Sequence, residues 1–199
     1  MNKIKRGRSE ITKLILIRHG EPDYSLVTAR NFKGHGLDLA QLTPRGIEQA
    51  TAASKDKRLE GASIIVSSPY TRALQTAAII SKERSLDISI EVDIHEWVPD
   101  LTFNNIYDEE VNTSSEECTS CKGEYTDDNT KKWERISVVA SRVFKGLEKY
   151  LNYEKIIVLT HGIVMTQFKY LQTISYCGII EVDFCKKFKW CGWVENTDK

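Results

Sequence analysis

Short apolar segments recur along the chain and predict strands that are buried on both faces. Residues 14–17 and 156–159 are apolar at every position, and residues 63–66 are apolar at all but the first. A strand with one exposed face would instead alternate apolar and polar positions. Residues 88–92 do alternate in this way and predict a fourth strand.

Helical patterns separate these strands. Thr43 as an N-cap and Pro44 at the first helical position predict a helix that continues to about residue 58. The Ser-Pro pair at 68–69 repeats this signal before a second apolar helical face. Apolar residues spaced by three and four positions predict a long amphipathic helix over residues 133–151.

The order of these elements predicts the fold class. Residues 163–171 form a further helical pattern, and residues 179–184 and 188–194 are candidates for a closing pair of strands. Strands that alternate with helices favour a parallel sheet with helices on both faces. We therefore expect an α/β fold, built as a three-layer α/β/α sandwich with a mostly parallel central sheet.

Two polar segments interrupt the alternation. Residues 20–41 contain several glycines and a proline and predict a loop, and loops of this length are often functional. Residues 100–130 are rich in Asn, Ser, Thr, Asp and Glu and predict an inserted excursion or lid. Because 199 residues with 41% hydrophobic content can bury one sizeable core, we expect a single domain over residues 1–199.

Composition changes this picture mainly by what it excludes. Lys+Arg and Asp+Glu both number 28, so no global field attracts the chain to nucleic acid or anionic lipid. The basic leader, residues 1–10, precedes no apolar run of signal-peptide length, and no stretch approaches the ~20 apolar residues of a membrane span. Five irregularly spaced cysteines are typical of reduced thiols, and Cys118 and Cys121 lack the further ligands of a zinc site. We expect a cytoplasmic protein that binds neither nucleic acid nor membrane.

Candidate chemistry gathers where the predicted strands end. In open α/β sheets, ligands bind beyond the carboxyl ends of the strands. Two arginines and two histidines delivered there can surround one small dianion, and adjacent glycines let the backbone approach it closely. The residues concerned are Arg18, His19 and Gly20 after the first strand, Arg72 at the start of the helix after the second, and His161 and Gly162 after the strand at 156–159.

Five motifs in this order resemble the histidine phosphatase superfamily, which includes cofactor-dependent phosphoglycerate mutases and many acid and metabolite phosphatases. RHG alone is a weak signal, whereas RHG, a downstream SSPxxRAxQTA and a late HG are specific together. The resemblance covers roughly residues 13–184. The motifs are RHGE at 18–21, LTPRGIEQA at 42–50, SSPYTRALQTA at 67–77, HEW at 95–97 and THG at 160–162.

The resemblance implies catalytic roles for five residues. His19, as a neutral imidazole with its lone pair directed at phosphorus, would be the nucleophile. Arg18 and Arg72 would hold the non-bridging oxygens and neutralise their charge during transfer. His161 would be a third donor, kept in its charged form by a bound dianion against the effect of desolvation. Glu96 would protonate the leaving alkoxide and then activate the hydrolytic water.

Two further positions complete the implied site. Ser25 stands six residues after His19, where mutases of this family usually carry an asparagine, and its hydroxyl would bind phosphate similarly. Gly162 would let the backbone approach the phosphate. No metal and no cofactor are expected, because Arg18 places a fixed cation beside His19 and so opposes metal binding.

The implied activity is that of a metal-independent phosphomonoesterase that hydrolyses a small phosphorylated metabolite through a phosphohistidine. A phosphoglycerate mutase is the alternative within the family. However, RHGEPDYS lacks the mutases' tryptophan-asparagine ending, and the acidic segment at 100–130 offers few cations for a second phosphate and a carboxylate. If the acidic run at 108–110 folds over the site, it would disfavour highly anionic substrates.

Two hypotheses come from other functional classes. A non-catalytic phosphate-binding or regulatory module would need the two arginines, but it would require neither His19 nor Glu96. A metallohydrolase that uses the 4 histidines would lose its activity in excess chelator, whereas a histidine phosphatase would not.

Overall fold

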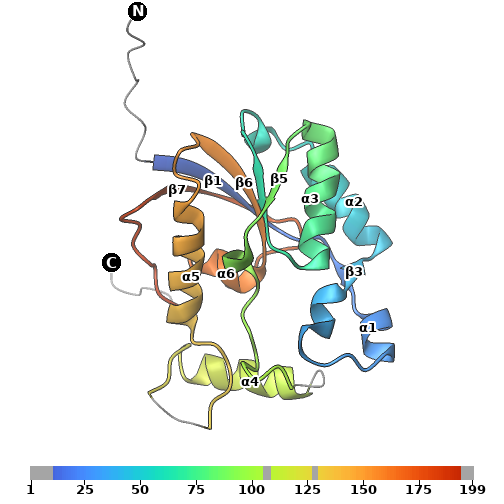
Figure 1. Cartoon of the computed structure of the whole chain (residues 1–199), viewed down its shortest axis with the longest axis vertical. Coiled ribbons are helices and arrows are strands. Elements are labelled where there is room, and N and C mark those ends of the chain that lie inside the picture. The colour runs from blue at the N-terminus through green and yellow to red at the C-terminus, as the bar shows by residue number, and fades with distance from the viewer. Residues whose placement is uncertain (1–10, 105–108, 127–129, 194–199) are drawn as a thin grey trace, which may run out of the picture.

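The computed structural model describes residues 11–104, 109–126 and 130–193, and its middle layer is a five-stranded sheet with the spatial order β5-β4-β6-β1-β7 (Figure 1). Neighbouring strands run parallel, except that β7 pairs antiparallel with β1. The predicted mostly parallel central sheet is therefore confirmed. The strands are β1 (Ile11–Arg18), β4 (Ile65–Ser67), β5 (Ile88–Ile90), β6 (Lys155–Thr160) and β7 (Ile179–Cys185).

Helices cover both faces of this sheet, as the sequence predicted. Side chains of β1 point alternately into two cores: Leu14 and Leu16 pack with α5 and α6, whereas Ile15 and Ile17 pack with α3. All four side chains are fully buried, which explains why this strand lacks an exposed polar face. The covering helices are α2 (Pro44–Ala53) and α3 (Thr71–Arg84) on one face, and α5 (Ile136–Glu148) and α6 (Gly162–Thr166) on the other (Figure 1).

The observed start of α2 agrees with the prediction, whereas its observed end does not. The Thr43 side chain accepts a hydrogen bond from Gly46 N, and Pro44 opens α2, so this N-terminus is confirmed. The helix ends at Ala53 rather than near residue 58, because the chain turns into a 3-10 helix at Lys57–Leu59. That turn is stabilised by the Asp56 side chain, which accepts a hydrogen bond from Arg58 N.

Other elements also differ from the prediction, among them α5, which was predicted over residues 133–151 and spans Ile136–Glu148. The first residue of α3 is Thr71, because the Ser68 hydroxyl that was expected to cap this helix lies 2.8 Å from His161 Nε2 instead. The helix α6 ends at Thr166 and does not continue to residue 171. Residues 188–193 form no strand, because Phe188 and Trp193 pack onto the core. Residue 194 lies outside the described residues.

The segment at 20–41, predicted as a loop, contains short regular elements. It holds the helix α1 (Ser25–Ala29) and a 3-10 helix at Gly34–Leu39. A two-stranded antiparallel sheet joins its ends, formed by β2 (Pro22–Asp23) and β3 (Gln41–Leu42). The segment is therefore a closed unit that begins directly after the end of β1.

The segment at 100–130, predicted as a polar excursion, contains the helix α4 (Glu109–Ser120). This helix lies beyond the carboxyl ends of the strands (Figure 1). Its buried Cys118 packs into the main core, and burial raises the pKa of this thiol to about 12, so it stays protonated. All five cysteines of the chain are free. Asp108, in the acidic run at 108–110, lies outside the described residues.

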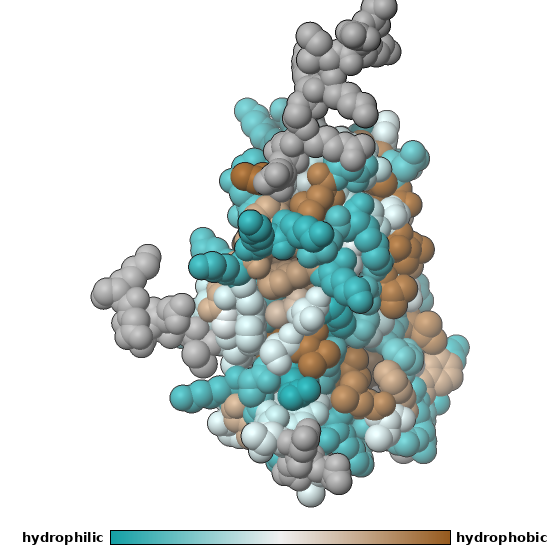
Figure 2. Space-filling model, turned by 60° about the vertical axis from the view of Figure 1, so that its left-hand side comes forward, coloured by the Kyte–Doolittle hydropathy of each residue, from teal (hydrophilic) through white to brown (hydrophobic). Residues whose placement is uncertain are grey.

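The outer surface is mixed in character. On the face seen in Figure 2, hydrophilic residues (teal) are interspersed with hydrophobic ones (brown). Within the described ranges, no helix has the length and apolar character needed to cross a membrane. The basic leader, residues 1–10, lies outside the described residues.

The loop after β1 presses directly against the first turn of α2. A methyl group on Gly20 would lie 2.5 Å from the Gly46 carbonyl oxygen, and one on Gly46 would overlap the carbonyl oxygen of Glu21. Thr43 N donates to that same Glu21 oxygen at 2.9 Å. Two glycines thus permit a backbone contact that holds the chain after His19 in place.

We expect the substitution Gly46→Ala to disturb this contact. Alanine favours a helix, but its methyl group has no space against Glu21, and overpacking of this kind costs about 1–3 kcal/mol. Urea unfolding should therefore show a lower free energy of unfolding. Glu48→Ala, at an exposed position of the same helix, is the control. Equal stability of the two variants would show that the contact imposes no constraint.

Candidate functional site

The carboxyl ends of three neighbouring strands bring the predicted residues together. β6 lies between β1 and β4, so residues following each strand are adjacent. His19 N donates to Thr160 O at 3.0 Å, and Ser68 N donates to Leu159 O at 2.9 Å. As a result the ring centroids of His19 and His161 lie 5.1 Å apart.

His19 is held as a neutral imidazole of defined orientation. Its Nδ1 lies 2.7 Å from the carbonyl oxygen of Gly20, which can only accept, so Nδ1 carries the proton. Its Nε2 then carries no proton, and the lone pair on this atom accepts a hydrogen bond from Arg72 Nε at 3.3 Å. Burial, followed by the charges of Arg72 and Arg18, lowers the pKa of His19 to about 3. A neutral ring with a directed lone pair is what a nucleophilic nitrogen requires.

His161 lies beside His19 and is completely buried. Its Nε2 lies 2.8 Å from the Ser68 hydroxyl. Burial lowers the pKa of His161 well below its ordinary value, and the charge of Arg72 adds to this effect. In the protein alone this ring is therefore neutral, so the charged form expected from the sequence needs the compensating charge of a bound dianion.

Arg18 and His161 each leave a buried polar atom without a hydrogen bond. Among the described residues, the buried side-chain nitrogens and oxygens without a partner are Arg18 Nε and His161 Nδ1. Arg18 Nη1 donates to Ile174 O, and its guanidinium carbon lies 4.3 Å from the centroid of the Tyr176 ring. An unsatisfied buried group costs about 1–3 kcal/mol. An anion that accepts from both nitrogens would remove this cost.

Glu96 approaches the same place from the turn after the 3-10 helix at Val92–Ile94. Its Oε1 accepts from Trp97 N at 2.9 Å, and its Oε2 accepts from Ile163 N at 3.5 Å, just after His161. Burial raises the pKa of Glu96, although these two backbone donors and Arg72 oppose the shift. A raised pKa makes proton donation by this carboxyl easier at a given pH, which suits a general acid.

A buried ion pair holds the turn that carries Glu96. Arg142, on α5, donates to the carbonyl oxygens of Asp93, His95 and Glu96 at 2.6, 2.8 and 3.1 Å. The same guanidinium binds both carboxylate oxygens of Glu134, at 2.7 and 3.0 Å. Glu134 also accepts from Val98 N at 3.3 Å. Bidentate contacts of this kind fix geometry as well as charge.

The two remaining predicted residues differ in their placement. Gly162 is the first residue of α6 and shares a hollow with Arg18 and Glu96. Ser25 is exposed at the start of α1, where its backbone nitrogen donates to Asp23 Oδ1 at 2.9 Å. Ser25 is not among the described residues that line the two hollows of the site.

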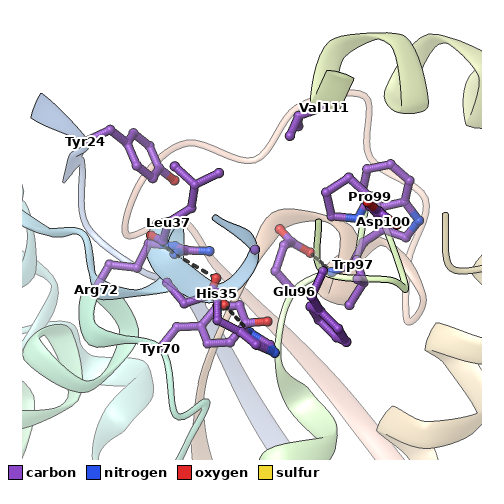
Figure 3. A pocket seen from close by; sticks show the side chains of 14 residues that line it. Tyr24, His35, Leu37, Tyr70, Arg72, Glu96, Trp97, Pro99, Asp100 and Val111 are labelled. Atoms are coloured by element: carbon purple, nitrogen blue, oxygen red, sulfur yellow. Dashed lines mark hydrogen bonds and ion pairs between the residues drawn. The ribbon is translucent and has the colours of Figure 1, made fainter. Parts of the chain in front are cut away.

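Two hollows flank Glu96. The first, here called the aromatic cavity, has a volume of about 300 Å³. In Figure 3, Arg72 and Glu96 face one another across it, and Val111 of α4 covers it. The second, here called the threonine hollow, has a volume of about 620 Å³. The aromatic cavity is lined by Tyr24, Gly34, His35, Leu37, Asp38, Tyr70, Arg72, Glu96, Trp97, Val98, Pro99, Asp100, Phe103 and Val111.

The threonine hollow lies on the Arg18 side of Glu96. It is lined by Arg18, Glu96, Gly162, Ile163, Tyr170, Leu171, Gln172, Ile174, Trp193 and three threonines, Thr119, Thr166 and Thr173. Thr119 belongs to α4, so this helix contributes a residue to each hollow. No group of three or more His, Cys, Asp or Glu side chains suited to a metal ion occurs within the described part of the chain.

Sequence reasoning missed the residues that support the site. Arg142 and Glu134 lie on or near the amphipathic helix, where charged residues usually face solvent, and no local pattern distinguishes them. Ser68 was assigned to a helix cap, whereas its hydroxyl contacts His161. The position of Ser68 within the SSPYTRALQTA motif was the one signal that could have indicated its place in the site.

Comparison with known families assigns most of the chain. Residues 14–173 match the family described as the histidine phosphatase superfamily (branch 1). No curated protein matches the sequence.

Several solved structures share the fold. A mycobacterial glucosyl-3-phosphoglycerate phosphatase is 18% identical, with a TM-score of 0.64 over 86% of this chain and 89% of that chain. A phosphoglycerate mutase from Bacillus anthracis str. Sterne is also 18% identical, with a TM-score of 0.64 over 89% and 90%. A putative alpha-ribazole-5'-P phosphatase from Escherichia coli K-12 is 23% identical, with a TM-score of 0.57 over 78% and 76%. At these identities the likeness shows the fold.

The burial of His19 predicts a pH-dependent stability. Its pKa falls from an ordinary value of 6.5 to about 3 on folding, so between these values the unfolded chain binds a proton that the folded protein does not. The free energy of unfolding therefore decreases as the pH falls through this window, by about 1.4 kcal/mol per pH unit for this residue. When the pH is lowered from 7 to 5, the free energy of unfolding measured in urea should therefore decrease by about 2 kcal/mol less for His19→Gln than for wild type.

The exposed His35→Gln is the control for loss of a histidine as such. A decrease in stability that is the same for wild type and His19→Gln would show that the His19 ring is not held neutral by its surroundings.

Proposed function

The chain belongs to the histidine phosphatase superfamily (branch 1), and we propose that it is a metal-independent phosphomonoesterase that hydrolyses a small phosphorylated metabolite through a phosphohistidine at His19. We further propose that Arg18, Arg72 and His161 bind the phosphoryl group and that Glu96 is the general acid. Gly162 would approach the phosphate with its backbone. Ser25 stays a weaker candidate, because its exposed position at the start of α1 would require it to move toward the phosphate.

One observation carries this proposal. A neutral imidazole with a directed lone pair lies beside buried nitrogens of Arg18 and His161 that have no partner in the described protein. A phosphoryl group accepts several hydrogen bonds and carries two negative charges, so it matches these donors and the charge of the two arginines. A site for an uncharged ligand would gain nothing from so many buried cationic donors.

The first proposed step forms the phosphohistidine. His19 Nε2 attacks phosphorus as the bond between phosphorus and the ester oxygen breaks, and Arg72 moves its hydrogen bond from Nε2 to a phosphoryl oxygen. The arginines neutralise the charge that spreads over the non-bridging oxygens. Glu96 gives its proton to the leaving oxygen, so an alcohol departs and a carboxylate remains.

The second proposed step hydrolyses that intermediate. The Glu96 carboxylate accepts a proton from a water molecule as the water oxygen attacks phosphorus, and the bond from phosphorus to His19 Nε2 breaks. Inorganic phosphate leaves, and Glu96 is again protonated. The enzyme returns to its starting state without an external acid or base.

A phosphoglycerate mutase would share the first step but return the phosphoryl group to a second oxygen of a bound acid. This alternative and the hydrolase differ in their products from 3-phosphoglycerate, which are an isomer in one case and glycerate with phosphate in the other. A phosphate-binding module would form no phosphoenzyme, and a metallohydrolase would lose its turnover in excess chelator. We expect turnover to persist in chelator.

We expect His19→Ala to lower the turnover of an aryl phosphate by at least about a thousandfold, because the neighbouring His161 has its Nε2 engaged with the Ser68 hydroxyl and is proposed to bind the phosphoryl oxygens rather than attack phosphorus. Acid-labile phosphoenzyme, trapped with a radiolabelled substrate, should form in wild type and be absent from the variant. Lys145→Ala, at an exposed position of α5 that lines neither hollow, is the control. Near-normal turnover by a folded His19→Ala protein would exclude this residue as the nucleophile.

We expect Glu96→Gln to reduce kcat/KM most for substrates with poor leaving groups. An alkyl phosphate needs protonation as its bond breaks and should lose about 10²–10⁴-fold, whereas p-nitrophenyl phosphate should lose much less. Glu21→Gln, which changes the carboxyl group next to Gly20, is the matched control. Equal losses on both substrates would assign the proton to another carboxyl group.

A further inference from the structure

The aromatic cavity differs from the phosphate-binding cluster in its chemistry. Apolar side chains form most of its wall, and aromatic rings stand on several sides of it (Figure 3). Trp97 is almost fully buried, and its Nε1 donates to Glu134 O outside the cavity, so its ring presents carbon surface inward. The aromatic and apolar wall residues are Tyr24, Leu37, Tyr70, Trp97, Val98, Pro99, Phe103 and Val111.

The basic side chains of this wall, Arg72 and His35, already have partners within the protein. Arg72 Nε donates to His19, and its Nη1 lies 3.4 Å from Leu37 O and 3.8 Å from Asp38 Oδ1. His35 Nδ1 lies 2.7 Å from Asp38 Oδ2. Among the described wall residues, Arg72 and His35 are the basic ones. The cavity therefore offers no spare cation to a second anionic group.

The same wall carries acidic groups. Asp100 accepts hydrogen bonds from the Thr102 nitrogen and hydroxyl at 2.8 and 2.7 Å. Burial opposes the ionisation of Asp100, but these hydrogen bonds outweigh it and lower its pKa, so the group is a carboxylate at neutral pH. Asp38 and Glu96 also line the cavity, but burial raises the pKa of both carboxyl groups, so the negative charge of the wall rests mainly on Asp100. A negatively charged ligand would be repelled here, whereas a neutral or positively charged one would not.

A strained backbone holds one aromatic ring at the cavity. Phe103 has a φ of 56°, a left-handed conformation that is unfavourable for a residue of this size. Its ring stacks on that of His35 with 4.3 Å between centroids, which joins the 3-10 helix at Gly34–Leu39 to the turn after Glu96. Phe103 nevertheless stays 41% exposed, so the ring keeps a free face. The exposed ring is therefore available to contact a ligand in the cavity.

The direction of attack selects this cavity over the threonine hollow. In phosphoryl transfer the attacking and leaving atoms lie roughly in line on opposite sides of phosphorus. The lone pair of His19 Nε2 points toward Arg72, which lines the aromatic cavity and not the threonine hollow. Glu96, which would protonate the leaving oxygen, faces Arg72 across the same space (Figure 3).

We propose that the aromatic cavity binds the leaving group, and that the preferred substrates are phosphomonoesters of aromatic or apolar alcohols without a negative charge. The proposal rests on the function proposed above and adds the class of substrate. It separates this chain from enzymes whose leaving group is a sugar acid or carries a second phosphate.

A matched series of aryl phosphates tests the proposal. Phenyl phosphate, 4-carboxyphenyl phosphate and 4-(aminomethyl)phenyl phosphate share one ring and differ in its charge. We expect kcat/KM for the carboxylated ester to be at least about tenfold below that for phenyl phosphate, with the aminomethyl ester at or above it. Glycerol phosphate, whose leaving group is polar, should also fall below phenyl phosphate. Equal or higher kcat/KM for the carboxylated ester would overturn the proposal.

Two substitutions on α4 locate the leaving group. Val111→Lys adds a cation to the aromatic cavity, and Thr119→Lys adds the same cation to the threonine hollow. Neither side chain is fully buried, so both variants should fold. Val111→Lys should raise kcat/KM for the carboxylated ester relative to phenyl phosphate by about tenfold, and Thr119→Lys should leave this ratio unchanged. The opposite result would place the leaving group in the threonine hollow and overturn the proposal.

The phosphoenzyme distinguishes this failure from failure of the proposed function. If wild type forms a phosphohistidine from phenyl phosphate but shows no preference against the carboxylated ester, only the substrate class is wrong. If no aryl phosphate is turned over and no phosphoenzyme forms, the proposed function fails, and the substrate class fails with it.

Discussion

The site depends on keeping two buried imidazoles neutral beside two guanidinium groups. Burial and the charges of Arg72 and Arg18 lower the pKa of His19 to about 3, and His161 is shifted in the same direction. Unpaired nitrogens remain on Arg18 and His161. The positive charge of the two arginines is only partly compensated within the described protein, because the Asp38 carboxylate oxygen lies 3.8 Å from Arg72 Nη1, too far for a direct hydrogen bond. A dianion supplies the missing charge and acceptors together, which is why the same arrangement favours both phosphate binding and a reactive nitrogen.

Different parts of the fold position the proposed anion pocket and the proposed acid, Glu96. The pocket is fixed by the sheet, because the ends of β1, β6 and β4 are joined by backbone hydrogen bonds from His19 and Ser68. Glu96 lies after β5, at the edge of the sheet, and owes its place to Arg142 on α5, which binds three backbone carbonyls of that turn together with Glu134. A buried ion pair adds little to net stability, but removal of one partner is strongly destabilising because it leaves a buried charge without compensation. We therefore assign Arg142 and Glu134 mainly to fixing the geometry of the turn.

The sequence predicted what depends on local pattern and left out what depends on distant contacts. Continuous apolar runs identified β1 and β6, and the Thr43-Pro44 signal located the start of α2. Motif spacing indicated that Arg18, His19, Arg72 and His161 would meet, and the strand order places them together. The helix α4 was missed because its apolar contacts are confined to a few positions such as Cys118, among polar residues that conceal the period. Arg142 could not be recognised, because its partners lie 8 to 49 residues away and only the fold brings them together.

Arg72 joins the proposed nucleophile, His19, to the wall of the aromatic cavity. Its Nε donates to His19, while its Nη1 contacts Leu37 O and lies near Asp38, in the 3-10 helix that lines the aromatic cavity. One planar cation thus serves both the nucleophile and the cavity wall, and its charge is shared between them. If the proposed dianion draws Arg72 toward it, the interaction of Arg72 with Asp38 would weaken, and the wall would become more negative. On the proposed function, the free energy of phosphate binding and the charge preference of the cavity would be coupled through this single side chain. Changes at Asp38 would therefore act through Arg72 on the electrostatic environment of His19 as well as on the cavity.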